Sequence, residues 1–234
     1  MDMDIDLIVF DMAGTTVMDD DAVHRQLQAA LAQVGVTASR HDVNAVMGMP
    51  KPHAIQALLT QHQGRTPSGD AVASVHASFM DRMIRYYRDD SGVRECEGAT
   101  DVLRWCRRHG VKTSLDTGFN RAIADAIIQR LGWSEAGLLD ATVASDEVPR
   151  GRPHPDMIFR LMELTLVPDS ARVAKVGDTP VDIAQGRAAG CGLVVAVTSG
   201  SHSAAELQPH GPTHLIETLS GLYAILERST AGAA

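Results

Sequence analysis

The residue in this sequence best placed for chemistry is Asp11, which follows four apolar residues at positions 7–10. An unbroken apolar run that ends in a carboxylate, with the small residues Ala13 and Gly14 directly after it, indicates a buried parallel strand that stops abruptly. Open α/β sheets bind their ligands at the carboxyl ends of such strands. A lone aspartate could equally end a strand in a turn, so its role depends on the rest of the chain.

Three later segments carry the other groups that phosphoryl chemistry at a carboxylate needs, namely hydrogen-bond donors and metal ligands. Thr117 follows a predicted strand at 111–115 and offers a hydroxyl, although a helix N-cap explains it equally well. Arg152 lies in a proline-rich segment between strand and helix and offers a planar fork for phosphate, whereas most arginines are solvated surface charges. Asp178 and Asp182 follow another buried strand and can hold Mg²⁺, Asp178 directly and Asp182 through water or hydrogen bonds.

Taken in this order, the four segments resemble the motifs of the haloacid dehalogenase superfamily. The resemblance implies that Asp11 attacks phosphorus and that Thr117 donates a hydrogen bond to the phosphoryl oxygen. It implies that Arg152 stands where many relatives carry lysine, and that Mg²⁺ is the cofactor. The implied metal ligands are Asp11, Ala13, Asp178 and Asp182, and the implied substrate contacts include Ala13, Gly14, Thr15 and Gly118.

Position 13 separates two branches of this superfamily. Its phosphomonoesterases carry a second aspartate two residues after the nucleophile, which serves as general acid for the leaving oxygen. Ala13 cannot donate a proton, and the loss of a general acid typically lowers the rate by about 10²- to 10⁴-fold. The sequence therefore predicts a poor ordinary phosphatase.

Residues 11–16 and the segment from Met47 to Lys51 resemble phosphonatase, which cleaves the P–C bond of phosphonoacetaldehyde. In that family a cap lysine condenses with the aldehyde, and the iminium accepts the electrons of the broken bond. The resemblance implies that Lys51 forms the Schiff base and that Met47 lines the pocket. A free lysine has a pKa near 10.4, so Lys51 needs desolvation or nearby positive charge, such as a helix N-terminus at Pro52. A solvated loop lysine is the alternative.

Three positions depart from the phosphonatase pattern. Ala54 stands where that family has histidine, Phe119 replaces a tyrosine in the substrate pocket, and Asp21 replaces a cysteine. These changes affect the handling of the aldehyde rather than phosphoryl transfer. They indicate a phosphonatase-like enzyme whose substrate is related to phosphonoacetaldehyde.

The elements that must position these residues fall into two groups. Apolar spacings of three and four over residues 19–88 predict amphipathic helices. From residue 92 onward helices and strands alternate, which predicts an α/β fold with a Rossmann-like, doubly wound parallel sheet. The strand at 5–10 must join this sheet. We therefore expect a core formed by residues 1–17 and 92–234, with an all-helical cap inserted at 18–91 and a frayed tail at 229–234.

Composition excludes several classes of protein. With 234 residues, 44% of them hydrophobic, the chain can bury a full core. Its net charge of −8 and the lack of lysine or arginine runs disfavour a nucleic-acid partner. An acidic start and the lack of a long apolar run predict a cytoplasmic protein with no signal peptide and no membrane partner. Cys96, Cys106 and Cys191 lack the spacing of a disulfide framework or a zinc site.

The oligomeric state is open. Phe79 and Tyr86 lie on the apolar face of a predicted helix at about 70–88. This face packs either inside the cap or against the cap of a second copy, so a homodimer through the cap is one expected arrangement.

We predict a Mg²⁺-dependent hydrolase that cleaves phosphonoacetaldehyde or a close analogue through a Lys51 Schiff base and an aspartyl-phosphate on Asp11. The alternative is a phosphatase for a small phosphomonoester whose leaving group needs no acid at Ala13. A binding or regulatory protein on an inactive scaffold is a third class, which the intact Asp11, Asp178 and Arg152 disfavour. The expected partner in both enzyme classes is a small phosphonate or phosphate.

Overall fold

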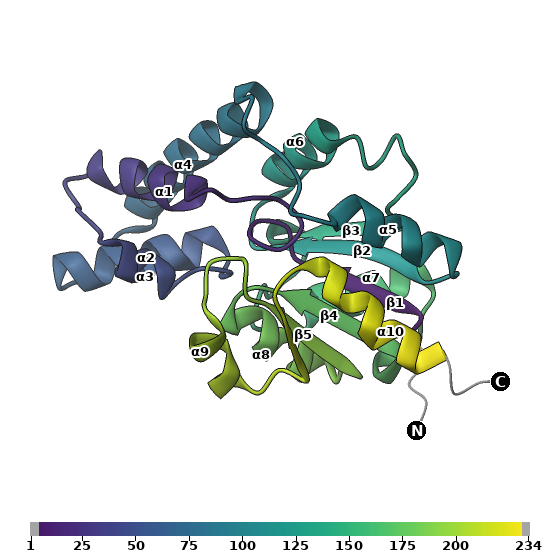
Figure 1. Cartoon of the computed structure of the whole chain (residues 1–234). Helices are drawn as coiled ribbons and strands as arrows, with labels where there is room; N and C mark the ends of the chain where they lie inside the picture. The colour runs from purple at the N-terminus through teal and green to yellow at the C-terminus, as the bar shows by residue number, and fades with distance from the viewer. Residues whose placement is uncertain (1–4, 231–234) are drawn as a thin grey trace.

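A parallel sheet with β1 near its middle organises the fold. In the computed structural model, which describes residues 5–230, six strands form this sheet in the order β3-β2-β1-β4-β5-β6 (Figure 1). Each neighbouring pair is parallel. The strands are β1 (Leu7–Phe10), β2 (Lys112–Thr117), β3 (Ala141–Ala144), β4 (Val173–Gly177), β5 (Leu193–Val197) and β6 (His214–Ile216). The predicted α/β class is confirmed.

Helices cover both faces of the sheet, and the alternation of side chains along β1 decides which residues meet them. Ile8 and Phe10 share an apolar core with one layer of helices, whereas Leu7 and Val9 pack against the other. The first layer contains α5 (Ala99–Arg108), α6 (Arg121–Leu131) and α10 (Leu222–Thr230), and the second contains α7 (Asp156–Thr165) and α8 (Pro180–Ala189). The same alternation directs Asp11 to the side of the sheet covered by α7 and α8.

Four helices from the predicted cap region lie together to one side of the sheet (Figure 1). They are α1 (Ala22–Ala32), α2 (Arg40–Asn44), α3 (Lys51–Gln63) and α4 (Gly69–Asp89). Ser39 and Ser68 begin two of them as N-caps, because each side-chain oxygen accepts a hydrogen bond from a backbone N–H of the first turn. The boundaries of the cap at residues 18 and 91 stay a prediction.

The apolar faces of the cap helices join the core of the sheet layer beneath them. Phe79 of α4 is fully buried, and its ring centroid lies 6.3 Å from that of Phe119 at the start of α6. This half of the predicted apolar face therefore packs inside the chain. The homodimer through the cap stays a prediction.

Some elements differ from those expected. The prediction that a strand ends at residue 115 is wrong, because β2 continues through Asp116 to Thr117. In a sequence, a charged residue after an apolar run indicates that the buried strand has ended. Asp116 can nevertheless be buried within β2, because it pairs with Arg152 and Lys175. The sequence did not reveal β6 or the short α9 (Ala204–Leu207), which are too brief for a periodic pattern. Helix α10 continues to Thr230, and the rest of the expected tail lies outside the described residues.

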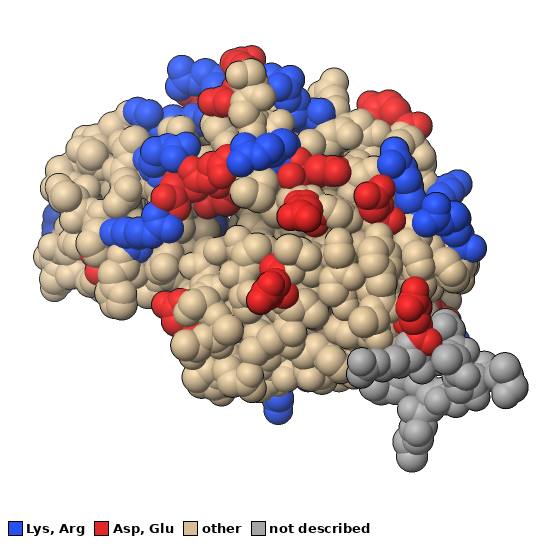
Figure 2. All heavy atoms as spheres, viewed as in Figure 1, with Lys and Arg blue, Asp and Glu red and all other residues tan. Residues whose placement is uncertain are grey.

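The surface and the helix lengths bear on possible partners. On the face shown in Figure 2, lysine and arginine side chains are interspersed with aspartate and glutamate. Among the described residues, no helix is both long and apolar enough to cross a membrane. The absence of a nucleic-acid partner stays a prediction.

Candidate active site

Asp11 lies directly beyond the carboxyl end of β1, where the chain turns sharply. Its backbone N–H donates to the Val176 carbonyl at 2.9 Å, which holds the residue in register with β4. The next residues form a tight loop in which the Thr16 hydroxyl donates to the Asp11 carbonyl at 2.9 Å. The Asp11 side chain is 5% exposed. The strand thus delivers a buried carboxylate to the edge of the sheet where ligands bind.

A buried network of charges surrounds this carboxylate. Nη1 of Arg152 lies 2.7 Å from Oδ1 of Asp11 and 3.0 Å from Oδ1 of Asp182. Nη2 of Arg152 donates to the backbone carbonyl of Asp116 at 2.9 Å and to its carboxylate. Lys175 donates to the same carboxylate and lies 3.1 Å from Oδ1 of Asp182. Two cations therefore hold three carboxylates together.

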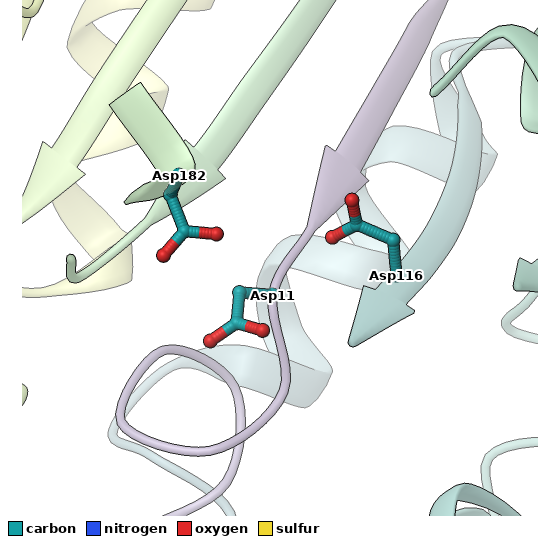
Figure 3. Close-up of side chains that lie close together, drawn as sticks. All are labelled: Asp11, Asp116 and Asp182. Carbon is teal, nitrogen blue, oxygen red and sulfur yellow. The ribbon is translucent and has the colours of Figure 1, made fainter. Parts of the chain in front are cut away.

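Figure 3 shows the three side chains close together, with Asp11 just beyond β1, Asp116 on β2 and Asp182 on α8. Oxygens of Asp11, Asp116 and Asp182 lie within 4.8 Å of one another, a spacing that would suit a metal ion. Arg152 and Lys175, however, already stand among these oxygens. The cluster is therefore better described as an ion-pair network than as the metal site itself.

Burial and neighbouring charges set the proton affinity of these acids. Burial raises the pKa of Asp11 to about 7, with Asp182 and Asp178 adding to the increase and Arg152 opposing it. Burial also disfavours ionisation of Asp182, but Arg152 and Lys175 outweigh it and bring the pKa of Asp182 below its usual value. The site thus has one firmly ionised acid that faces the cations, and one acid that needs further positive charge to stay ionised.

Asp178 is a fourth buried carboxylate, outside the ion-pair network. Its Oδ1 accepts from the Thr15 hydroxyl at 3.1 Å, and its Oδ2 accepts from the backbone N–H and hydroxyl of Ser201 at 2.7 and 2.6 Å. Gly14, at φ +88°, and Gly200 approach this carboxylate so closely that a Cβ atom on either would overlap it. Burial raises the pKa of Asp178, and the charge of Asp182 adds to this. The backbone is shaped around a carboxylate that a cation would stabilise.

These residues fit a hard divalent cation, since the available donors are all oxygens. Asp11 and Asp178 offer carboxylates, and Ala13 between them in the sequence can offer only its backbone oxygen. Asp182 is less available, because its Oδ2 accepts from the backbone N–H and hydroxyl of Thr179 at 3.2 and 2.6 Å and its Oδ1 faces two cations. The roles of these residues as metal ligands stay a prediction.

Lys51 is the first residue of α3, and the cap places it over the core site. It is 4% exposed, and its Nζ lies 5.4 Å from the centroid of the Phe119 ring. Burial lowers the pKa of Lys51 to about 8, although Asp11 and Asp19 oppose the shift. The lysine is therefore not the solvated loop residue of the alternative interpretation.

Most of the predicted substrate contacts surround one small cavity. The cavity has a volume of about 20 Å³ and is lined by Asp11, Ala13, Met47, Lys51, Thr117, Gly118, Phe119 and Arg152, among others. Thr117 lies at the end of β2, where its Oγ1 accepts from the backbone N–H of Phe119 at 3.2 Å. A space of this size holds about one water molecule. In this arrangement the cavity therefore has no room for a phosphonate or a phosphate ester.

Glycines allow the cap loop to approach the core so closely. A Cβ atom on Gly118 would lie 2.8 Å from the backbone oxygens of both Gly48 and Met49. On the cap side, Gly48 has φ +79° and packs against Thr179. The motif glycines thus act at the contact between cap and core.

Sequence reasoning missed Asp116, Lys175 and Ser201. The available signal for the first two was a charged residue inside each of two strands that otherwise read as buried. Ser201 gave no comparable signal, because its link to Asp178 arises only when the loop after β5 folds back.

Comparison with known proteins agrees with this arrangement. Residues 5–190 match the family model for haloacid dehalogenase-like hydrolases. Phosphonoacetaldehyde hydrolase of Bordetella pertussis is 30% identical over 254 aligned residues, which cover 95% of this chain and 91% of that protein. The corresponding enzyme of Bordetella avium is 33% identical over 208 residues, covering 84% and 73%.

Solved structures show the same fold. A phosphonoacetaldehyde hydrolase-like protein from Oleispira antarctica has a TM-score of 0.84 and 19% identity, covering 96% of this chain and 92% of that one. A protein from Lactobacillus delbrueckii provisionally named phosphoglycolate phosphatase has a TM-score of 0.79 and 22% identity, covering 96% and 99%.

The parallel sheet, the carboxylate beyond its central strand and the matched family model make this protein a hydrolase with a Rossmann-like α/β core. Its similarity to the phosphonoacetaldehyde hydrolases defines a smaller group within this class. The chain belongs to the haloacid dehalogenase-like hydrolases and, within them, to the phosphonatase-like enzymes.

Proposed function

We propose that this enzyme hydrolyses a small phosphonate that carries a carbonyl group, phosphonoacetaldehyde or a close analogue, by cleavage of its P–C bond. One observation carries this proposal: Lys51 from the cap and Asp11 from the core line the same cavity, and Lys51 is buried with a pKa of about 8. A phosphatase needs no nucleophilic amine opposite its own nucleophile, whereas Schiff-base chemistry does. The likeness to phosphonoacetaldehyde hydrolases supports the same substrate class.

In the first step the free amine of Lys51 adds to the substrate carbonyl, and loss of one water with uptake of one proton leaves an iminium. An oxygen of Asp11 then attacks phosphorus while the P–C bond breaks, and the electron pair of that bond enters the iminium to give an enamine. Water cleaves the resulting aspartyl-phosphate to inorganic phosphate and free Asp11. Protonation of the enamine at carbon gives an iminium again, and its hydrolysis by water releases an aldehyde, one proton and the free amine of Lys51.

The other residues of the cavity have defined tasks in this scheme. Arg152, already 2.7 Å from Asp11, supplies positive charge to the phosphoryl oxygens, and the Thr117 hydroxyl is placed to donate to one of them. Ala13 cannot donate a proton to the carbon that leaves phosphorus, so the electron pair of the broken bond is available to form the enamine. We propose Asp11, Asp178 and the Ala13 backbone oxygen as holders of Mg²⁺, which when bound would offset the charge between carboxylate and phosphonate.

The second candidate is a phosphatase acting on a small phosphomonoester. Two observations favour it: Ala54 is fully buried where phosphonatases have a histidine, and the fold is shared with the protein provisionally named phosphoglycolate phosphatase. Lys51 would then only bind the substrate.

Borohydride trapping separates the two candidates. The enzyme is incubated with phosphonoacetaldehyde and Mg²⁺, reduced, digested and mapped by mass spectrometry, alongside Lys51→Arg and the control Lys112→Arg. Lys112 is an exposed strand residue paired with Asp140. We expect a reduced adduct on Lys51, and loss of phosphate release only in Lys51→Arg. No adduct, together with Mg²⁺-dependent activity on phosphate esters that survives Lys51→Arg, would exclude P–C cleavage and support the phosphatase.

A further inference from the structure

The ion-pair network contains two residues that phosphoryl transfer does not use directly, Asp116 and Lys175. Register explains why they meet, since Val9 pairs with Ser114 on one side and with Lys175 on the other. Side chains alternate along a strand, so Asp116, two residues beyond Ser114, shares the face that carries Asp11 and Lys175. The carboxylate and the ammonium thus meet across β1, beneath the nucleophile.

Asp116 holds Arg152 at two points. The Nη2 atom of Arg152 donates both to the Asp116 carbonyl, at 2.9 Å, and to its carboxylate. Lys175 donates to the same carboxylate oxygen. Asp116 and Lys175 are both fully buried, so each compensates part of the other's charge, together with Arg152 and Asp182.

Arg152 lines the cavity, whereas Asp116 and Lys175 lie behind it. With Nη2 anchored on Asp116, the planar guanidinium directs Nη1 at Asp11. Asp182 also contacts Nη1, at 3.0 Å, so both ends of the guanidinium are fixed. Without the Asp116 carboxylate, its Nη2 end would keep only the hydrogen bond to the backbone carbonyl, and Nη1 would be less tightly fixed beside Asp11.

We propose that Asp116, paired with Lys175, is a positioning residue that fixes the Arg152 guanidinium against the nucleophile Asp11. The inference rests on the proposed phosphoryl transfer to Asp11, but not on the Schiff base. It assigns β2 a task beyond presenting the Thr117 hydroxyl, and it explains why this strand carries a buried acid before its last residue.

The test compares Asp116→Asn with the matched control Asp140→Asn, which alters an acid directly before β3 that pairs with Lys112 at the start of β2. Because small displacements of catalytic groups cost up to about 100-fold in rate, we expect kcat to fall about 10- to 100-fold in Asp116→Asn, with KM changed less than threefold. A double variant, Asp116→Asn with Lys175→Met, removes both buried charges. It allows the same measurement if the single variant fails to fold. Equal kcat in Asp116→Asn and the wild type would overturn the proposal.

A double-mutant cycle separates positioning from general structural damage. If Asp116 acts through Arg152, Asp116→Asn has little further effect on a protein that already carries Arg152→Ala. A loss of the same size in both backgrounds would refute the proposal. NMR of ¹⁵N-arginine-labelled, metal-free enzyme gives a readout independent of turnover. The buried Arg152 Nη signals should broaden or exchange faster in Asp116→Asn, and unchanged signals would also contradict the proposal.

Oxygen exchange between inorganic phosphate and ¹⁸O-water, with Mg²⁺ present, keeps the two proposals apart. This exchange needs Asp11 and a phosphoryl group but no carbonyl and no Lys51. Exchange that depends on Asp116, without turnover of phosphonoacetaldehyde, would retain the positioning role and reject the P–C substrate. P–C turnover with exchange insensitive to Asp116→Asn would reject the positioning role alone.

Discussion

The depressed pKa of Lys51 makes a quantitative prediction about its reactivity. Burial lowers this pKa from 10.5 to about 8, which increases the fraction of free amine at pH 7 roughly 300-fold. Below pH 8 the free amine, and hence the rate of its reaction with an electrophile, should rise about tenfold per pH unit. Above about pH 8.5 the reaction rate of Lys51 should level off, whereas the rate of an ordinary lysine would continue to rise through pH 10.

Competitive labelling with acetic anhydride between pH 6 and 10, followed by peptide mass mapping, measures this titration directly. The exposed Lys112 in the same molecule corrects for loss of reagent. A Lys51 labelling rate that continues to rise tenfold per unit beyond pH 9 would refute the desolvation argument. It would also remove the observation on which the proposed Schiff base rests.

A single substitution tests the electrostatic part of the same argument. Asp19 raises the pKa of Lys51, so Asp19→Asn should move the plateau to lower pH. Asparagine can still accept the hydrogen bond that Asp19 Oδ1 receives from the Val23 N–H at 2.9 Å, so the start of α1 is preserved. Asp20→Asn is the control, because Asp20 pairs with Arg94 at the surface. A plateau that moves to higher pH in Asp19→Asn, or equally in both variants, would contradict this reasoning.

Three further predictions concern the cap contact, the metal and the stability of the fold. Gly118→Ala places a methyl group 2.8 Å from two cap carbonyls, so it should hold the cap off the core. We expect kcat/KM to fall by about 10-fold or more, with little change in Tm. Wild-type kinetics in this variant would show that the cap does not close at Gly118. Asp178→Asn should raise the Mg²⁺ concentration needed for half-maximal phosphate release at least about tenfold. A Mg²⁺ titration measures this, with Asp140→Asn as the control variant. An unchanged Mg²⁺ requirement would exclude Asp178 as a ligand. Leu166 ends α7 at φ +60° with 87% of its surface exposed. Glycine adopts this backbone conformation without strain, so Leu166→Gly should raise the free energy of unfolding in urea by about 0.5–1 kcal/mol. A lower urea midpoint would show that the exposed leucine contributes packing.

The sequence alone determined the class of fold and the chemistry of the principal groups. Alternating helices and strands, and an apolar run ending at Asp11, are local patterns, so the parallel sheet and the place of this carboxylate could be predicted from them. The resemblance to the superfamily motif also marked Ala13 as the position where its phosphomonoesterases carry a general acid. The resemblance of residues 47–51 to the lysine segment of phosphonatases pointed to Lys51 as the amine.

Tertiary structure alone decided how these groups act on one another. Asp116 and Lys175 are separated by 59 residues and meet only because β2 and β4 flank β1 in a fixed register. The pKa of Lys51 depends on burial beneath the cap, and the fit at Gly118 depends on where the cap loop rests. Burial, charge compensation and close approach are properties of the folded neighbourhood, whereas residue type and spacing belong to the chain.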